Sequence, residues 1–363
     1  MCRAWVIGLA AALGTAAAYL LLWPVPISPA KWRPPEAPAL VGAYAPNTAL
    51  VATERWVAGP APESVAIDAD GDVYTGLLDG SVVHVSQGEA PVTVAEAQGQ
   101  LLGMGFDGTG ELLICGLDGR LLSVSPGGAV RRVVEEIDGQ PLRLVNDLDI
   151  AGDGTVYFTE SSTETTDTLL DLLEHRGNGR LLAYRPDSGD TDVLLTGLYY
   201  ANGVAVSADG SFALVVETTK YRVRRLWLTG PRQGEDEVFI DNLPGFPDGI
   251  SCDEDGLFWV ALMNPRNGFI DWALERPWVR KIAARLPLAW FTGAAPRYGF
   301  VLGLDEDANV VYNLQDPSGD HYAGISCVVR RGDFLYFGSL LEDAVGVLPV
   351  PHENGPPRKG GSH

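Results

Sequence analysis

Residues 145–162 read "VNDLDIAGDGTVYFTESS" and combine a short apolar strand, a glycine turn and a second strand. Residues 155–159 are all strand-favouring types, and the "GDG" before them is typical of a turn. The same layout recurs along the chain, with an anchor residue eight positions before a turn glycine. The six anchors are Glu63, Leu102, Asn146, Asn202, Asp248 and Gly324.

Six copies of one strand–turn–strand unit predict an all-β fold, a six-bladed β-propeller over residues 47–350. A third strand often follows each unit, as in "SVVHVS" (81–86) and "RLLSVS" (120–125). The sixth unit ends without an outer strand. We expect residues 48–57 to supply that strand, because such a closure removes an exposed sheet edge.

Composition limits the function classes. The net charge is −21 over 363 residues and nothing in the sequence forms a basic stripe, which argues against nucleic-acid binding. The four cysteines show no CxxC spacing, which argues against a zinc site. Cys252 and Cys327 occupy equivalent "GISC" contexts, and this pattern is compatible with buried free thiols or with a disulfide.

The N-terminus carries an apolar run without a charged residue from position 4 to position 23. Its length is sufficient for a transmembrane helix, so residues 1–23 predict a retained signal anchor, with a cleaved signal peptide as the alternative. A Pro-rich linker (24–46) and a flexible tail (351–363) are expected on either side of the propeller. Arg3 precedes the run, while Lys31 and Arg33 follow it; we expect the propeller on the extracytoplasmic side of the membrane.

In a propeller the first strand of each blade lines the central channel, so the anchors converge on the axis. Four of them carry side-chain oxygen: Glu63, Asn146, Asn202 and Asp248. Two carboxylates and two amides suit Ca²⁺, and without an ion the carboxylates would repel each other. The alternative is that Asn and Asp cap turns at strand starts. That alternative explains neither Glu63 nor the shared register, so we predict an axial Ca²⁺ site.

Several long segments, including "GPAPESVAIDADGDVYTGLLDGSVV" (59–83) and "NLPGFPDGISCDEDGLFWVALMNPR" (242–266), resemble the strictosidine-synthase-like family. The wider superfamily includes the paraoxonases and the gluconolactonase/regucalcin group, all six-bladed propellers. In its calcium-dependent members a Glu, two Asn and an Asp hold a catalytic Ca²⁺. The resemblance assigns these roles to the same four anchors.

The chain departs from parts of the family pattern. Strictosidine synthases use a Glu at the start of the sixth blade for a condensation, and "YAGIS" (322–326) has no acid there. Ser64 stands where paraoxonases carry an acid for a second Ca²⁺, and His84 is the only histidine between Glu63 and Asn146. The resemblance therefore disfavours the condensation, a second ion and a paraoxonase-type His pair.

The expected chemistry is Ca²⁺-dependent hydrolysis of a small lactone or aryl ester. Asp248 is the predicted general base or nucleophile, and Glu63 is mainly a ligand. His321, in "GDHYAG", is predicted on the channel mouth as a proton shuttle, or else is a solvated loop histidine. Asp149 is expected to be a turn or surface carboxylate. The competing function is a non-enzymatic, membrane-tethered propeller that binds a ligand or partner.

Two inserts, "TDTLLDLLEH" (166–175) and "GFIDWALERPWVRKIAARLPLAWF" (268–291), are too apolar for plain loops. Both are predicted to be helical. They form either a lid with an apolar wall over the site or a membrane-facing patch. Packing between blades is the less favoured alternative, because the inserts lie outside the repeated strands.

Overall fold

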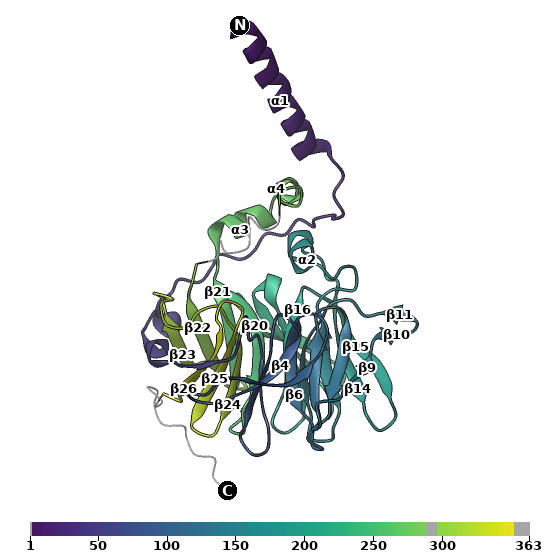
Figure 1. Cartoon of the computed structure of the whole chain (residues 1–363), viewed down its shortest axis with the longest axis vertical. Helices are drawn as coiled ribbons and strands as arrows, with labels where there is room; N and C mark the ends of the chain where they lie inside the picture. Colours follow the sequence, from purple (N-terminus) through teal and green to yellow (C-terminus); the bar gives the residue numbers. More distant parts are fainter. Residues whose placement is uncertain (1, 288–295, 352–363) are drawn as a thin grey trace.

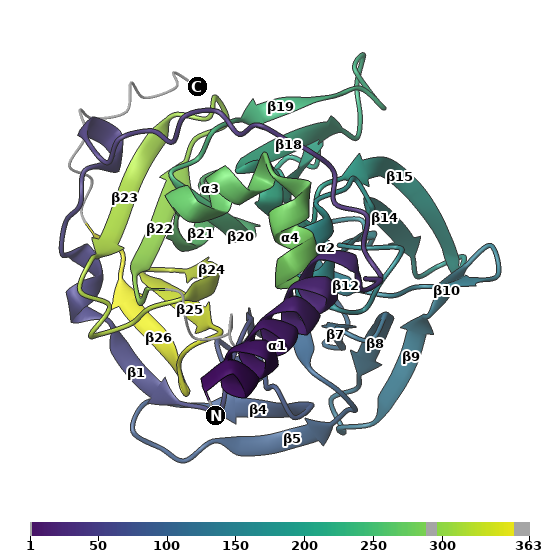
Figure 2. The same cartoon turned by 90° about the horizontal axis from the view of Figure 1, so that it is seen from above.

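The computed structural model describes residues 2–287 and 296–351. In this part of the chain, six four-stranded antiparallel sheets are arranged around one axis (Figures 1 and 2). The predicted six-bladed propeller is therefore confirmed. A two-stranded ribbon, β10 (Glu136–Ile137) with β11 (Gln140–Pro141), projects between the second and third blades.

Each of the first five blades uses four consecutive strands, from the axis to the rim. The first blade contains β2 (Val65–Ile67), β3 (Val73–Gly76), β4 (Ser81–Val85) and β5 (Val92–Glu96), and the second contains β6 (Leu101–Phe106), β7 (Leu112–Gly116), β8 (Arg120–Val124) and β9 (Val130–Val134). The third blade contains β12 (Val145–Ile150), β13 (Val156–Glu160), β14 (Gly179–Arg185) and β15 (Asp190–Leu198), and the fourth contains β16 (Ala201–Val206), β17 (Phe212–Glu217), β18 (Arg222–Trp227) and β19 (Asp236–Ile240). The fifth blade contains β20 (Gly245–Cys252), β21 (Phe258–Pro265), β22 (Gly299–Leu304) and β23 (Val310–Asp316).

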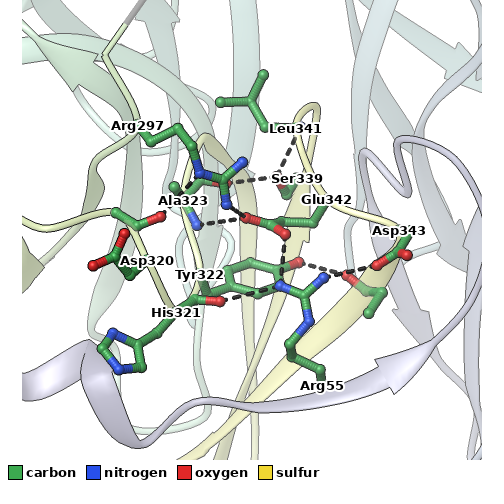
Figure 3. Close-up of polar contacts among 12 residues, drawn as sticks. Arg55, Arg297, Asp320, His321, Tyr322, Ala323, Ser339, Leu341, Glu342 and Asp343 are labelled. Carbon is green, nitrogen blue, oxygen red and sulfur yellow. Dashed lines mark hydrogen bonds and ion pairs between the residues drawn. The ribbon is translucent and has the colours of Figure 1, made fainter.

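The sixth blade contains β24 (Ile325–Arg331), β25 (Phe334–Ser339) and β26 (Ala344–Pro349), and its outer strand is β1 (Glu54–Val57). The N-terminal segment thus closes the ring as predicted. The closing strand is shorter than expected, because Ala49–Ala52 form a 3₁₀ turn, η2. Arg55 on β1 contacts the buried Glu342 at 2.6 Å and Asp343 at 2.7 Å, and Arg297 pairs with the other Glu342 oxygen (Figure 3).

The six first strands contact one another in a closed ring, β2–β6–β12–β16–β20–β24. In five of them the pairing register slips immediately at or after the anchor position, which is the signature of a β-bulge. A bulge redirects the side chains that follow it. This repeated irregularity therefore determines where the anchors and their neighbours point.

Packed apolar clusters between successive blades hold the ring together, with Trp259, Phe258 and Phe300 among the largest fully buried side chains. Cys115, Cys252 and Cys327 are all free thiols. The sequence left a disulfide between Cys252 and Cys327 open, and the structure shows that these two thiols are not bonded.

The N-terminal run forms one helix, α1 (Cys2–Leu22), and its segment 5–22 is long and apolar enough to cross a membrane. Residues 24–46, which we call the strap, are extended but packed on the propeller instead of behaving as a free linker. Their backbone bonds to three blades, through Ala30 N to Glu174 O (2.9 Å), Trp32 N to Leu274 O (3.1 Å), Asn242 Nδ2 to Glu36 O (2.9 Å) and Gln315 Nε2 to Tyr44 O (3.1 Å). The predicted tail lies outside the described residues from position 352 onward.

The inserts are helical as predicted, forming α2 (Thr168–Glu174), α3 (Gly268–Leu274) and α4 (Pro277–Ala283); Trp290 lies outside the described residues. The antiparallel pairs Val145 with Glu160 and Gly245 with Pro265 place the end of each second strand beside the start of the first. The inserts follow those second strands, so they lie at the same end of the propeller as the anchors (Figures 1 and 2).

Candidate metal site on the propeller axis

The four oxygen-bearing anchors come together on the axis. Asn146, Asn202 and Asp248 sit in the bulges of β12, β16 and β20, and all three are buried. Asn202 Nδ2 donates to Asp248 Oδ1 at 2.5 Å. Glu63 precedes β2, and its carboxylate is close enough to that of Asp248 for their charges to interact.

Neighbouring hydroxyl groups determine the orientation of both amides. Thr218 Oγ1 donates its single proton to the carbonyl oxygen of Pro247 (2.8 Å), so it can only accept from Asn202 at 3.1 Å. Ser161 Oγ likewise donates to the carbonyl of Ala201 (2.6 Å) and accepts from Asn146 at 2.9 Å. The amide nitrogens are therefore the engaged atoms, and Oδ1 of each Asn is the atom available as a ligand.

The site is electrostatically unbalanced. Burial, reinforced by the charge of Asp248, raises the pKa of Glu63 well above its usual range. Burial raises the pKa of Asp248 to about 7, although the hydrogen bond from Asn202 opposes this shift. Among the described residues, neither carboxylate forms an ion pair with a basic side chain. A cation is the natural complement of such a pair.

Two further residues belong to the site and were missed by sequence reasoning. Gln100 Nε2 donates to Glu63 Oε2 at 3.0 Å and so orients the ligand of the first blade. Tyr200 is buried two positions before Asn202, and its hydroxyl contacts Thr168 Oγ1 of α2 at 3.3 Å. Neither residue stands at an anchor position, so the repeat register gave no signal for them.

The bulge also changes the positions of the two carboxylates after Asn146. The Oδ2 atoms of Asp147 and Asp149 accept from the backbone N–H groups of Val204 (3.3 Å) and Val206 (2.7 Å) in the next blade. Burial raises the pKa of Asp147 to about 8 and that of Asp149 to about 6. The expectation that Asp149 is a turn or surface carboxylate is wrong, because it joins two blades.

His321 is not brought to the anchors. Its Nδ1 lies 2.9 Å from Asp316 Oδ2 at the end of the outer strand β23, and its backbone carbonyl accepts from Arg55 on the outer strand β1. Its ring points away from Glu342 (Figure 3). The expected position on the channel mouth therefore differs from the observed one near the rim between the fifth and sixth blades.

A second buried cluster lies under the strap. The ring of Trp32 stacks on His175 at 4.8 Å, and Lys220 Nζ lies 4.2 Å from Trp32 and 4.1 Å from Tyr199. Burial, with the charges of Lys220 and Arg280, lowers the pKa of His175 to about 3. This histidine is therefore neutral at physiological pH and supports the packing of the strap.

The four donor side chains fit a hard dication. They do not fit a metal that needs three or more His, Cys, Asp or Glu ligands. Within residues 2–287 and 296–351, no group of three or more His, Cys, Asp or Glu side chains is placed to hold a metal ion. The axial set instead pairs two carboxylates with two amide oxygens. Such oxygen ligands are those preferred by Ca²⁺.

Solved structures with a similar fold include a gluconolactonase of Xanthomonas campestris, with a TM-score of 0.61 and 18% identity over 91% of this chain and 99% of that one. A calcium-binding protein, regucalcin, of Agrobacterium tumefaciens has a TM-score of 0.55 and 17% identity over 82% and 93% of the two chains. At this level of identity the likeness concerns the fold.

Relatives in sequence are closer. The Arabidopsis thaliana protein STRICTOSIDINE SYNTHASE-LIKE 10 is 37% identical over 80% of this chain and 85% of its own length. Human adipocyte plasma membrane-associated protein is 33% identical over 88% of this chain and 83% of its own. The family models "Strictosidine synthase-like, N-terminal" and "Strictosidine synthase" match residues 42–85 and 146–231. The chain therefore belongs to the strictosidine synthase-like family.

Proposed function

We propose that the protein is a Ca²⁺-dependent hydrolase of lactones or aryl esters, acting at the axial site. The observation that carries the proposal is the convergence of Glu63 and Asp248 with the amides of Asn146 and Asn202 in a buried position that has no basic partner among the described residues. A gluconolactonase fold and a calcium-binding fold among the structural neighbours are consistent with it.

Glu63, Asn146, Asn202 and Asp248 would hold the ion. When bound, Ca²⁺ would supply a Lewis acid that polarises a carbonyl oxygen of the substrate. Gln100 keeps Glu63 directed at the axis through its 3.0 Å hydrogen bond. Ser161 and Thr218 keep both amide oxygens in the ligand orientation.

Asp248 is the residue proposed to take a proton from water or to attack the carbonyl carbon directly. Asn202 engages its Oδ1, which leaves Oδ2 for this role. α2 is held beside the site by the Tyr200–Thr168 contact, and its leucines would exclude water from the reaction.

The direct test is hydrolysis of phenyl acetate and of a panel of lactones by the full chain, with added Ca²⁺ and with chelator. We expect activity that chelation removes and Ca²⁺ restores. Asp248→Asn retains an oxygen ligand, so at saturating Ca²⁺ it should still bind the ion while activity falls by roughly 10² or more.

Asp253→Asn is the matched control, because Asp253 is equally buried but bonds to Trp259 and Arg330 away from the anchors. It should lower stability and leave activity per folded molecule unchanged. Absence of hydrolysis from folded, Ca²⁺-loaded wild type would overturn the proposal in favour of a propeller that only binds a ligand or partner.

A further inference from the structure

The helices α3 and α4 show a reversed distribution of side chains. Phe269, Trp272 and Trp278 are 65%, 42% and 59% exposed, and Phe269 stacks on Trp272 with ring centroids 5.6 Å apart. Aromatic side chains of this size are normally turned toward the core of a protein in water. Here they form the outer surface of two consecutive helices. We call Phe269, Ile270, Trp272 and Trp278 together the aromatic face.

Two charged residues of the same helices, Asp271 and Arg280, point inward. Asp271 accepts from Tyr221 Oη at 2.8 Å and from Arg266 at 2.9 Å. Arg280 is only 3% exposed, and its guanidinium donates to the backbone carbonyls of Leu173 (2.9 Å) and Leu274 (3.0 Å). Polar contacts on the inner side thus hold both helices in place, so the exposed aromatic rings do not reflect a loosely packed insert.

The position of α1 indicates what covers the aromatic face. Tyr19 in the last full turn of α1 donates to the carbonyl of Arg285, two positions after α4, at 3.0 Å, and Arg285 donates to the carbonyl of Trp23 at 2.7 Å. α1 rises from the same end of the propeller on which α3 and α4 lie (Figure 1). If α1 spans a bilayer, these contacts place α4 at the depth of the lipid headgroups.

The charges near the aromatic face fit the same occupant. Between residues 268 and 287 the basic side chains are Arg276, Arg280, Lys281 and Arg285, and the acids are Asp271 and Glu275. Because Asp271 and Arg280 face inward, Arg276, Lys281 and Arg285 remain against Glu275. This local excess is opposite in sign to the net charge of −21. The guanidinium of Arg276 lies 4.5 Å from the ring centroid of Trp272. At a bilayer surface, this arrangement suits an aromatic ring that contacts the acyl chains and a guanidinium that contacts lipid phosphate.

We propose that the aromatic face docks on the surface of the bilayer that α1 enters, as a second membrane contact. Amphipathic aromatic rings and basic side chains are the groups that favour this interface. The docked propeller then has its anchor end turned toward the lipid. The proposal is independent of hydrolysis, because it concerns the orientation of the tethered domain.

The test places a spin label, through p-acetylphenylalanine, at Trp278 or at Phe334 in the full chain. Phe334 is the matched control, since it is an aromatic residue 43% exposed at the start of β25, at the opposite end of the blade. The protein is reconstituted into vesicles of phosphatidylcholine and phosphatidylserine. Collision with oxygen, which is concentrated in lipid, is compared with collision with a water-soluble Ni(II) chelate.

We expect the label at position 278 to favour oxygen several-fold over the chelate relative to the label at position 334. With the label at Phe269 in both proteins, a double Trp272→Glu/Trp278→Glu variant should show a lower preference for oxygen than the otherwise wild-type chain, while the protein still floats with the vesicles through α1. Equal aqueous exposure at 278 and 334, failure of the chain to float, or shielding of the label at 278 from both quenchers by a second copy would overturn the proposal.

Discussion

Thr218→Val tests whether the orientation of one amide sets the affinity of the axial site. Valine has nearly the shape of threonine but lacks the hydroxyl that accepts from Asn202 at 3.1 Å and donates to the Pro247 carbonyl at 2.8 Å. Without that acceptor, Asn202 retains only its contact with Asp248. Its amide then loses the constraint that directs Oδ1 toward the ion.

The expected loss follows from the contacts. One neutral hydrogen bond contributes about 1 kcal/mol, a factor of about 5 in affinity. Residues that orient metal ligands typically contribute about 10- to 100-fold to metal affinity. We therefore expect the affinity for Ca²⁺ to fall by a factor between about 5 and about 100. The unpaired carbonyl of Pro247 costs stability with or without the ion, and therefore changes affinity little.

Calorimetric titration of Ca²⁺ into the full chain in detergent measures the change. Thr159→Val is the matched control, because its buried hydroxyl donates to the backbone carbonyl of Asn202 at 2.7 Å and does not touch the amide. The control should lose stability but bind Ca²⁺ like wild type. Equal affinity in Thr218→Val and wild type would refute the argument that hydroxyl groups directly after the second strands orient the ligands.

Three further predictions concern ring closure, catalysis and pH. Arg55→Met leaves the buried Glu342 with one arginine instead of two, and in a urea titration it should lower the free energy of unfolding by about 1–3 kcal/mol. Arg132→Met, which removes an exposed ion pair, is the control and should change this free energy by less than about 0.5 kcal/mol. Equal effects of the two substitutions would contradict a role of Arg55 in closing the ring. At saturating Ca²⁺, the pH profile of hydrolysis should lose its acidic limb, the fall in rate as Asp248 is protonated, in Asp248→Asn, and an unchanged profile would remove Asp248 from the base role. Burial lowers the pKa of His175 to about 3, so the folded state binds fewer protons than the unfolded state and stability falls as the pH drops below about 6.5. His175→Phe should lack this loss, about 2 kcal/mol at pH 5, and parallel wild-type and variant profiles between pH 7 and pH 5 would contradict it.

Local sequence determined the repeated parts of this protein. The turn glycines and the alternating strands recur six times, so blade number, ring closure near residue 54 and the four oxygen-bearing anchors could be predicted from spacing alone. The helical inserts and the apolar N-terminal helix were also predictable, because runs of leucine and aromatic residues interrupt the strand pattern.

Only the tertiary structure decided how those parts meet. The bulges change which residues of the first strands face the neighbouring blade, and Asp149 therefore bonds to Val206 in that blade. The loop holding His321 runs along the rim because Asp316 and Arg55 capture it there. Gln100, Ser161 and Thr218 became part of the site through contacts with residues that stand 15 to 37 positions away in sequence.

The exposed aromatic face depends on the same kind of information. The sequence showed that residues 268–291 are apolar, and this pattern did not distinguish a lid over the site from a membrane-facing patch. Contacts with the strap and with α2 turn Arg280 inward, and Trp278 outward in consequence. Local periodicity specifies which elements form, whereas the partner of each face depends on segments that meet only when the ring of blades closes.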